Sequence, residues 1–301
     1  MLSTMFSGCK NIKGQSKRQS YLSDLGGVYS SDIDDIDFSL EVSGRLTEAE
    51  YASADTESGE LPVETSLVSE NSGRDKIRSW GIRRKEGNQP PDADPGAPEL
   101  LKKYNSLYIG DTSKKVVYLT FDEGYENGYT PKILDVLHAN NTKAAFFITG
   151  PYLKQHQDLV RRMVEEGHIV GNHTIHHPSL PTISDYEIEE EVLGLDRAFR
   201  EKFGKSMKYL RPPKGEYSER TLELTSKLGY RNVFWSFAYD DWYRDKIRGP
   251  QYAYDIVMRN LHNGAIILLH AVSKDNADAL DMIIKGIKER GYTIGTLDDI
   301  E

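Results

Sequence analysis

Residues 116–137 read VVYLTFDEGYENGYTPKILDVL, and this stretch decides the fold class. Its first six residues form a mostly apolar run of the kind found in buried strands. Helical spacing follows from Thr130 to Ala139, with Pro131 in the first turn, where a proline costs no helical hydrogen bond. A buried strand followed at once by a helix is the repeating unit of a parallel sheet.

The same alternation continues to the C-terminus. Further strands are predicted at 144–149, 168–172, 208–212, 231–237, 265–270 and 292–296. Further helices are predicted at 159–166, 186–203, 218–228, 252–261 and 277–290. Ser184 and Glu187 spell a capping box ahead of the longest helix. Seven strands separated by helices predict an α/β fold with a parallel sheet, either open or closed into a barrel.

The chain before this domain divides into three parts by composition. Residues 1–9, MLSTMFSGC, resemble the end of a lipoprotein signal with Cys9 as the acylated residue; the alternative is an incidental exposed thiol. Residues 10–73 are rich in Ser, Gly, Asp and Glu and are predicted to be a disordered acidic spacer. Residues 74–114 contain a Pro-rich strap that Trp80 anchors, or else a plain linker.

Charge and cysteine content exclude several kinds of partner. The net charge is −9, but residues 20–72 alone hold thirteen acidic residues and one arginine, so the remainder carries +3. No dense Lys/Arg stripe is present, which argues against nucleic acid as a partner. With one cysteine, the chain forms no internal disulfide and no Cys-based zinc site. No run of eighteen apolar residues exists, so a lipid on Cys9 is the only predicted membrane attachment.

Polar residues gather where the predicted strands end. They are Asp122 and Glu123 after the first strand, His173 and His177 after the third, Arg211 at the end of the fourth, Asp241 and Trp242 after the fifth, and His270 at the end of the sixth. In parallel sheets and barrels, the active site lies at the carboxyl ends of the strands. The pattern therefore predicts one shared site.

Two histidines and a carboxylate are a common metal site that leaves positions open for water and substrate. The spacing of His173 and His177 predicts one turn of helix that aims both rings at one point, with His176 pointing elsewhere. A cation would also relieve the repulsion between Asp122 and Glu123, so that one ligates and the other accepts a proton from water. The alternatives are surface or capping histidines and an acidic helix cap.

Five segments resemble the ordered motifs of the NodB-type polysaccharide deacetylases, carbohydrate esterase family 4. They are TFDEG (120–124), HTIHHP (173–178), RPPKG (211–215), DDW (240–242) and IILLH (266–270). The resemblance covers residues 115–301, and stretches such as LLHAVSKDNADALD (268–281) are similar to the muramic-acid deacetylase branch. It implies a distorted (β/α) barrel that removes N-acetyl groups from muramic acid of peptidoglycan, outside the cytoplasm, in the formation of the δ-lactam of spore cortex.

The resemblance also implies roles for individual residues. The implied catalytic residues are Asp122 as the general base, Arg211 as its orienting partner, Asp241 as the partner of Arg211, and His270 as the acid. The implied ligands of a divalent metal, usually zinc, are Glu123, His173 and His177. The implied substrate contacts are Pro213, Lys214, Trp242 and Leu268. A backbone N–H near Lys214 would share the oxyanion with the metal.

Two residues depart from the family pattern. Glu123 stands where the family usually has Asp, and it reaches one methylene further, so metal affinity and metal identity stay open. Lys214 stands where an aromatic residue is usual, and we expect it to pair with a substrate carboxylate such as the lactyl group of muramic acid; the alternative is a solvated lysine.

Two other functions are compatible with these residues. The first is the same reaction on N-acetylglucosamine of peptidoglycan or chitin. The second is a weakly catalytic glycan-binding protein of the cell envelope, which the change at Glu123 suggests. The presence of Asp122, His270 and both motif histidines favours an enzyme, because a binding protein needs none of their acid–base chemistry. The sequence predicts no oligomeric state.

Overall fold

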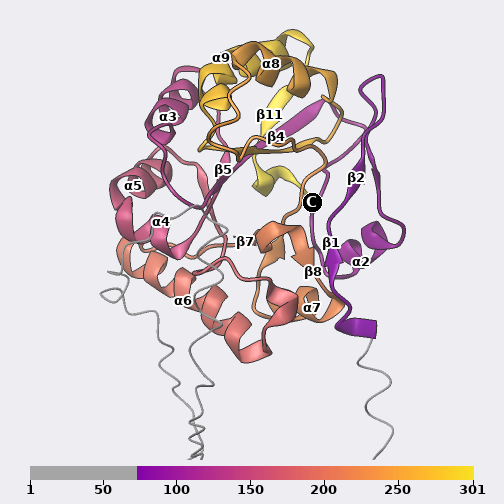
Figure 1. Ribbon diagram of the computed structural model, residues 1–301, viewed down its shortest axis with the longest axis vertical. Helices are drawn as coiled ribbons and strands as arrows, with labels where there is room; N and C mark the ends of the chain where they lie inside the picture. Colours follow the sequence, from indigo (N-terminus) through magenta and orange to yellow (C-terminus); the bar gives the residue numbers. More distant parts are fainter. Residues whose placement is uncertain (1–72) are drawn as a thin grey trace, which may run out of the picture. The chain divides into compact units, whose positions relative to one another are not determined.

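The structure is a computed structural model that describes residues 73–301 (Figure 1). The predictions made for residues 1–9, including Cys9, and for residues 10–72 lie outside the described residues. In the described part of the chain, no helix is long and apolar enough to cross a membrane.

A seven-stranded parallel sheet forms the centre of the domain. Its order is β10-β4-β5-β6-β7-β9, and β11 pairs with the first half of β4. The strands are β4 (Val116–Glu123), β5 (Ala145–Ile148), β6 (Ile169–Asn172), β7 (Tyr209–Leu210), β9 (Arg231–Asn232), β10 (Ile266–His270) and β11 (Thr293–Gly295). The seven predicted strands are therefore confirmed, although β7 and β9 are shorter than expected.

Helices follow most of these strands. They are α3 (Thr130–Ala139), α4 (Gly150–Gln155), α5 (Gln157–Glu165), α6 (Asp185–Phe203), α7 (Glu219–Lys227), α8 (Pro250–Arg259) and α9 (Lys274–Glu289). The capping box of Ser184 and Glu187 is present at the start of α6. Helix α4 is not predicted from the sequence, because its six residues are too few to show helical periodicity.

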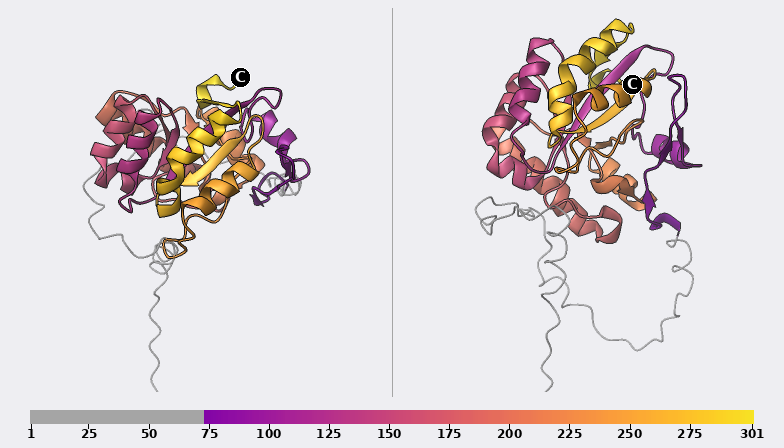
Figure 2. Two further views of the ribbon diagram at one scale, coloured as in Figure 1. Left: turned by 90° about the horizontal axis from the view of Figure 1, so that it is seen from above. Right: turned by 45° about the horizontal axis from the view of Figure 1, so that its top comes forward.

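The strands curve into a distorted barrel that an irregular segment closes. Beyond β9, Phe237 forms a parallel bridge with Ile267 of β10, and the Ser236 N–H donates to the Ile266 carbonyl at 3.0 Å. This contact joins the far edge of the sheet to β10, so the predicted (β/α) barrel is confirmed. Figure 2 shows the helices outside the strands, with the residues before β4 on the flank opposite α3 and α5.

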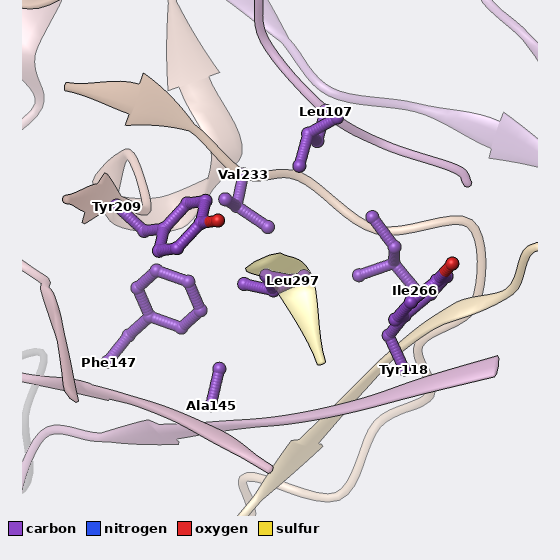
Figure 3. Packing of buried hydrophobic residues seen from close by; sticks show 8 residues of the cluster. All are labelled: Leu107, Tyr118, Ala145, Phe147, Tyr209, Val233, Ile266 and Leu297. Atoms are coloured by element: carbon purple, nitrogen blue, oxygen red, sulfur yellow. The ribbon is translucent and has the colours of Figure 1, made fainter. Parts of the chain in front are cut away.

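Apolar side chains fill the barrel at the amino ends of its strands. Leu297, in the 3₁₀ turn Leu297–Asp299, lies at the centre of this cluster (Figure 3). The side chains around it come from several strands and loops, namely Leu107, Tyr118, Ala145, Phe147, Tyr209, Val233 and Ile266. Because this apolar cluster fills the barrel at the amino ends of the strands, a site can form only at their carboxyl ends.

Residues 73–96 lie along the domain and form two small antiparallel pairs. Strand β1 (Arg78–Ser79) pairs with β8 (Glu216–Tyr217), and β2 (Ile82–Arg83) pairs with β3 (Asp92–Ala93), ahead of helix α2 (Ala97–Lys103). Trp80 is buried, donates its indole N–H to the Trp235 carbonyl at 2.8 Å and contacts Phe234. The Trp80 backbone N–H also bonds the Gly215 carbonyl at 2.8 Å, which ties this segment to the RPPKG turn.

Candidate active site

The register of the sheet brings four motifs to one edge. Asp122 of β4 lies opposite His270 of β10, and Asn172 of β6 lies opposite Leu210 of β7. The residues that follow these last two strands therefore begin at the same edge as Asp122. The TFDEG, HTIHHP, RPPKG and IILLH motifs thus meet without any rearrangement of the strands.

Arg211 fixes the position of Asp122. Its side chain is fully buried and lies over the Phe147 ring, with 4.1 Å between the guanidinium carbon and the ring centroid. It donates from Nη1 to Asp122 Oδ1 at 2.6 Å, from Nη2 to Thr120 Oγ1 at 2.8 Å and from Nε to the Val233 carbonyl at 3.1 Å. Three donors with fixed acceptors leave the guanidinium little freedom to move.

These contacts also set the charge of Asp122. Burial alone would raise the pKa of its carboxyl group. The charge and the hydrogen bond of Arg211 outweigh burial and hold that pKa below its ordinary value. Asp122 is therefore a buried carboxylate that stays ionised at neutral pH.

A loop, and not a helical turn, brings His173 and His177 together, so the predicted helix is wrong. Thr174 and His177 have left-handed backbone conformations, with φ angles of 67° and 58°. The Thr174 N–H donates to Asn172 Oδ1 at 2.8 Å, and the His177 N–H donates to Thr174 Oγ1 at 3.0 Å. This tight loop places the two rings 4.7 Å apart between centroids. His176 points elsewhere, as expected, and its Nδ1 lies 2.7 Å from Glu191.

Both of these imidazoles are neutral at physiological pH. Burial lowers the pKa of His173 and lowers that of His177 to about 3, and in His177 the charge of Lys214 adds to the effect of burial. His173 Nδ1 lies 2.8 Å from the Arg211 carbonyl, which only accepts, so Nδ1 carries the proton. The unprotonated Nε2 then faces Asp122 Oδ2 at 3.6 Å.

His270 pairs with Asp241, which corrects the expected pairing of Asp241 with Arg211. Asp241 accepts from the His270 ring Nδ1 at 2.7 Å and from the His270 backbone N–H at 2.9 Å. The hydrogen bonds of Arg211 go to Asp122, Thr120 and Val233 instead. Burial lowers the pKa of His270, but the charge and hydrogen bond of Asp241 outweigh burial and raise it above its ordinary value.

Glu123 lies on the other face of β4, so the expected metal triad is not assembled. Successive side chains of a strand point to opposite faces, and Asp122 occupies the inner one. Glu123 is fully buried; its Oε2 accepts from Thr130 Oγ1 at 3.4 Å, while Oε1 has no hydrogen-bond partner among the described residues. Burial, then the charges of Glu126 and Asp122, raise the pKa of Glu123 well above its usual value.

The donors present therefore do not fit a three-ligand metal ion. A ligating carboxylate must be ionised, and burial opposes ionisation of Glu123 by raising its pKa. Within residues 73–301, no three His, Cys, Asp or Glu side chains group as a metal site. The pair His173 and His177 remains as a set of two neutral nitrogen donors.

The remaining predicted residues surround this centre. Leu268 is buried on β10, and Pro213 is buried in the 3₁₀ turn Pro213–Gly215. Trp242 is 47% exposed and meets the His270 ring edge-on at 5.7 Å between centroids. Lys214 is exposed with a φ of 59°, and its positive charge helps to lower the pKa of His177.

Two buried residues of the site, Asn276 and Tyr239, were not predicted from the sequence. Asn276, in the first turn of α9, donates from Nδ2 to Asp241, and its Oδ1 bonds the hydroxyl of Tyr239. Asn276 lies within the LLHAVSKDNADALD stretch but just before the helix predicted at 277–290, so it was assigned no role. Nothing in the spacing indicated that an amide would contact Asp241.

Comparison with known proteins gives consistent matches. The family model described as polysaccharide deacetylase matches residues 109–233. The peptidoglycan-N-acetylmuramic acid deacetylase PdaA of Bacillus subtilis is 47% identical over 223 residues, which cover 74% of this chain and 85% of that protein. An uncharacterized 30.6 kDa protein in the fumA 3' region of Geobacillus stearothermophilus is 54% identical over 222 residues, 73% of this chain and 84% of that protein. The solved structure of Bacillus subtilis PdaA, described as a family 4 carbohydrate esterase, matches with a TM-score of 0.73 and 46% identity over 75% of this chain and 97% of that one.

Proposed function

Since this chain belongs to the polysaccharide deacetylase family, we propose that it hydrolyses the N-acetyl group of muramic acid in peptidoglycan. The observation that supports this most strongly is the arrangement at one strand edge of Asp122, whose pKa is lowered, and His270, whose pKa is raised. The similarity to the muramic acid deacetylase of Bacillus subtilis, at 47% identity, supports muramic acid as the sugar. Such a substrate places the reaction in the cell wall.

The two titratable groups divide the proton transfers between them. Asp122 accepts a proton from water as the water oxygen attacks the acetyl carbonyl carbon. Arg211 keeps the accepting oxygen in place through the 2.6 Å hydrogen bond. His270 then donates its Nε2 proton to the amide nitrogen as the C–N bond breaks, so that acetate and a free amine leave. Asp241 holds the opposite ring nitrogen, Nδ1, at 2.7 Å, which aims Nε2 toward the reacting centre.

The oxyanion of the tetrahedral intermediate requires fixed donors near the acyl carbon. We assign this role to the backbone N–H of Lys214, because Pro213 has no N–H and the Gly215 N–H donates to the Pro212 carbonyl at 3.1 Å. Members of this family generally depend on a divalent metal, for which His173 and His177 are the available donors here. Glu123 does not join them, because its side chain faces Thr130.

Substrate recognition falls to the residues around the rim. The exposed Trp242 ring offers an apolar face for a sugar ring, and Leu268 lies where the acetyl methyl group would pack. Lys214 is exposed and forms no ion pair with a described residue, so its ammonium is available for the lactyl carboxylate of muramic acid. A free amine beside that carboxylate is the precursor required for lactam closure, which is the basis for proposing a role in spore cortex. A lipid on Cys9 would anchor the enzyme to the outer face of the membrane.

Product analysis tests the proposal. The full chain is incubated with peptidoglycan whose peptide stems have been removed, and the products are analysed by mass spectrometry with and without zinc and chelator. We expect acetyl loss from muramic acid, and we expect Lys214→Ala to reduce this activity about 10-fold relative to activity on neutral chito-oligomers, because one charge-assisted contact is lost. Loss of acetyl only from glucosamine would indicate the alternative substrate, and loss from neither sugar would favour a glycan-binding protein. Lys208→Ala, an exposed lysine that pairs with Asp298, is the matched control.

A further inference from the structure

A chain of hydrogen bonds connects His270 to the interior of the domain. It runs from His270 Nδ1 to Asp241 Oδ1 at 2.7 Å, from Asp241 Oδ2 to Asn276 Nδ2, and from Asn276 Oδ1 to the Tyr239 hydroxyl. Asp241, Asn276 and Tyr239 are all buried, with exposed fractions of 5% or less. Water is therefore a poor substitute for any of these partners.

The direction of every bond in this chain is fixed by chemistry. Asn276 Nδ2 also lies 3.2 Å from the His270 carbonyl, so it faces a carboxylate and a carbonyl, both of which only accept. The amide nitrogen must occupy this position, which leaves Oδ1 toward Tyr239 and makes the tyrosine hydroxyl the donor. A rotated amide would set two acceptors against Asp241 and His270.

The consequence for Asp241 is that three donors converge on its carboxylate. They are the His270 backbone N–H at 2.9 Å, the His270 ring Nδ1 and the Asn276 amide. Two of the three approach Oδ2, so Oδ1 stays turned toward the imidazole ring. Asn276 thereby helps to hold the carboxylate in the single orientation that keeps the proton on His270 Nδ1.

Asn276 is itself held by the start of α9. Ser273 caps this helix, and its Oγ accepts from the Asn276 N–H at 3.3 Å. A side chain in the first turn of a capped helix has a well-defined position before any substrate arrives. The contact is therefore preorganised by the fold.

We propose that Asn276 is a positioning residue for the general acid His270, acting through Asp241, and that Tyr239 sets the orientation of the Asn276 amide. The inference rests on the proposed function, in which His270 donates a proton. Neither Asn276 nor Tyr239 is assigned a contact with the substrate.

The test compares Asn276→Leu with Asn232→Leu in the full chain. Asn232 is equally buried, at 1% exposed, but it bonds Thr225 on another part of the barrel. We expect Asn276→Leu to lower kcat about 10–100-fold with KM changed less than about 3-fold, as is typical when the partner of a catalytic group loses its support. Asn232→Leu should leave both constants close to those of the wild type.

A pH profile separates positioning from general destabilisation. His270 faces the charges of Asp241, Asp122 and Arg211, and its activity requires the protonated ring, so activity is lost as pH rises through the His270 pKa. Without the Asn276 donor, the charge of Asp241 acts more strongly on His270 and raises its pKa. The alkaline limb should therefore move to higher pH by roughly 0.5–1 unit, the equivalent of one hydrogen bond. Asn232→Leu should not move it.

NMR titration of the His270 ring measures the same shift without any substrate. If Asn276→Leu does not fold, Asn276→Asp and Tyr239→Phe replace it, with the larger upward shift expected for the aspartate because it adds a carboxylate beside Asp241. An alkaline limb and an NMR titration that match the wild type in these variants would overturn the proposal. A shifted NMR titration in a protein that deacetylates no glycan would support the network and reject the proposed function.

Discussion

The two faces at the end of β4 hold neighbouring carboxyl groups whose pKa values shift in opposite directions. On the inner face, Asp122 accepts from Arg211 at 2.6 Å, and its pKa is lowered despite full burial. On the outer face, Glu123 has Thr130 as its hydrogen-bond donor at 3.4 Å, and burial with the charges of Glu126 and Asp122 raises its pKa well above the usual value. One residue along the strand thus separates a carboxyl group whose pKa is lowered from one whose pKa is raised.

The difference shows that strand geometry and not residue type assigns the roles. The alternation of side-chain direction along β4 points Asp122 toward the barrel interior, where Arg211 donates to it. It points Glu123 toward α3 and α4. A buried carboxylate needs a cation or several donors, and only the inner face supplies a cation. Replacing each group in turn therefore tests whether the two faces differ in function as they do in charge.

The largest effect is expected from Asp122→Asn. The amide keeps the shape of the side chain but accepts no proton, so kcat should fall about 10²–10⁴-fold with little change in KM. The measurement is acetate release at saturating substrate. Because Asn leaves the buried Arg211 without its carboxylate, circular dichroism at the assay temperature is used to show that the variant is still folded and that the loss is catalytic. If the variant retains more than about a tenth of the wild-type activity, Asp122 is not the general base.

The fold could be predicted in detail because its signals are local. Each helix from α5 to α9 shows apolar periodicity, and the VVYLTF run marks β4 without ambiguity. The strands β7 and β9 are only two residues long in the structure, because the Arg211 turn and the irregular 233–237 segment replace regular pairing. Closure of the barrel through Phe237 depends on a contact with Ile267 that no local pattern records.

The site was predictable to the level of which residues meet, but not of how they pair. Strand-end placement correctly gathered Asp122, His173 and His270. It did not show that Asp241 bonds His270 rather than Arg211, since both partners lie at the same edge. Side-chain direction on β4 was the other limit, because adjacent carboxylates in a sequence look equivalent until the strand assigns each a face.

A second prediction sharpens the comparison through stability. Arg211→Met leaves Asp122 as a buried charge without its cation, so the free energy of unfolding should fall by about 3–5 kcal/mol. The measurement is chemical denaturation at neutral pH. Arg162→Met is the matched control, because Arg162 pairs with Asp135 and Glu166 near the surface, where an ion pair contributes roughly 0–1 kcal/mol.

The double variant Arg211→Met with Asp122→Asn isolates the buried charge. It should recover part of the stability lost in Arg211→Met alone, because the carboxylate that needed the cation is gone. Equal stability of the single and double variants would mean that Arg211 acts by packing on Phe147 and not by pairing with Asp122.

The smallest effect is expected from Glu123→Gln on the outer face. Glutamine has the shape of a neutral glutamic acid, so kcat should stay within about 3-fold of the wild type and zinc affinity within about 2-fold. Affinity is measured by competition with a zinc-binding dye, which does not depend on activity, and His177→Gln serves as the control that should weaken binding. Loss of a true carboxylate ligand costs at least roughly 10–100-fold in metal affinity. A fall of that size in Glu123→Gln would show that the zinc-loaded protein turns Glu123 to the inner face, and the separation between the two faces of β4 would then hold only without metal.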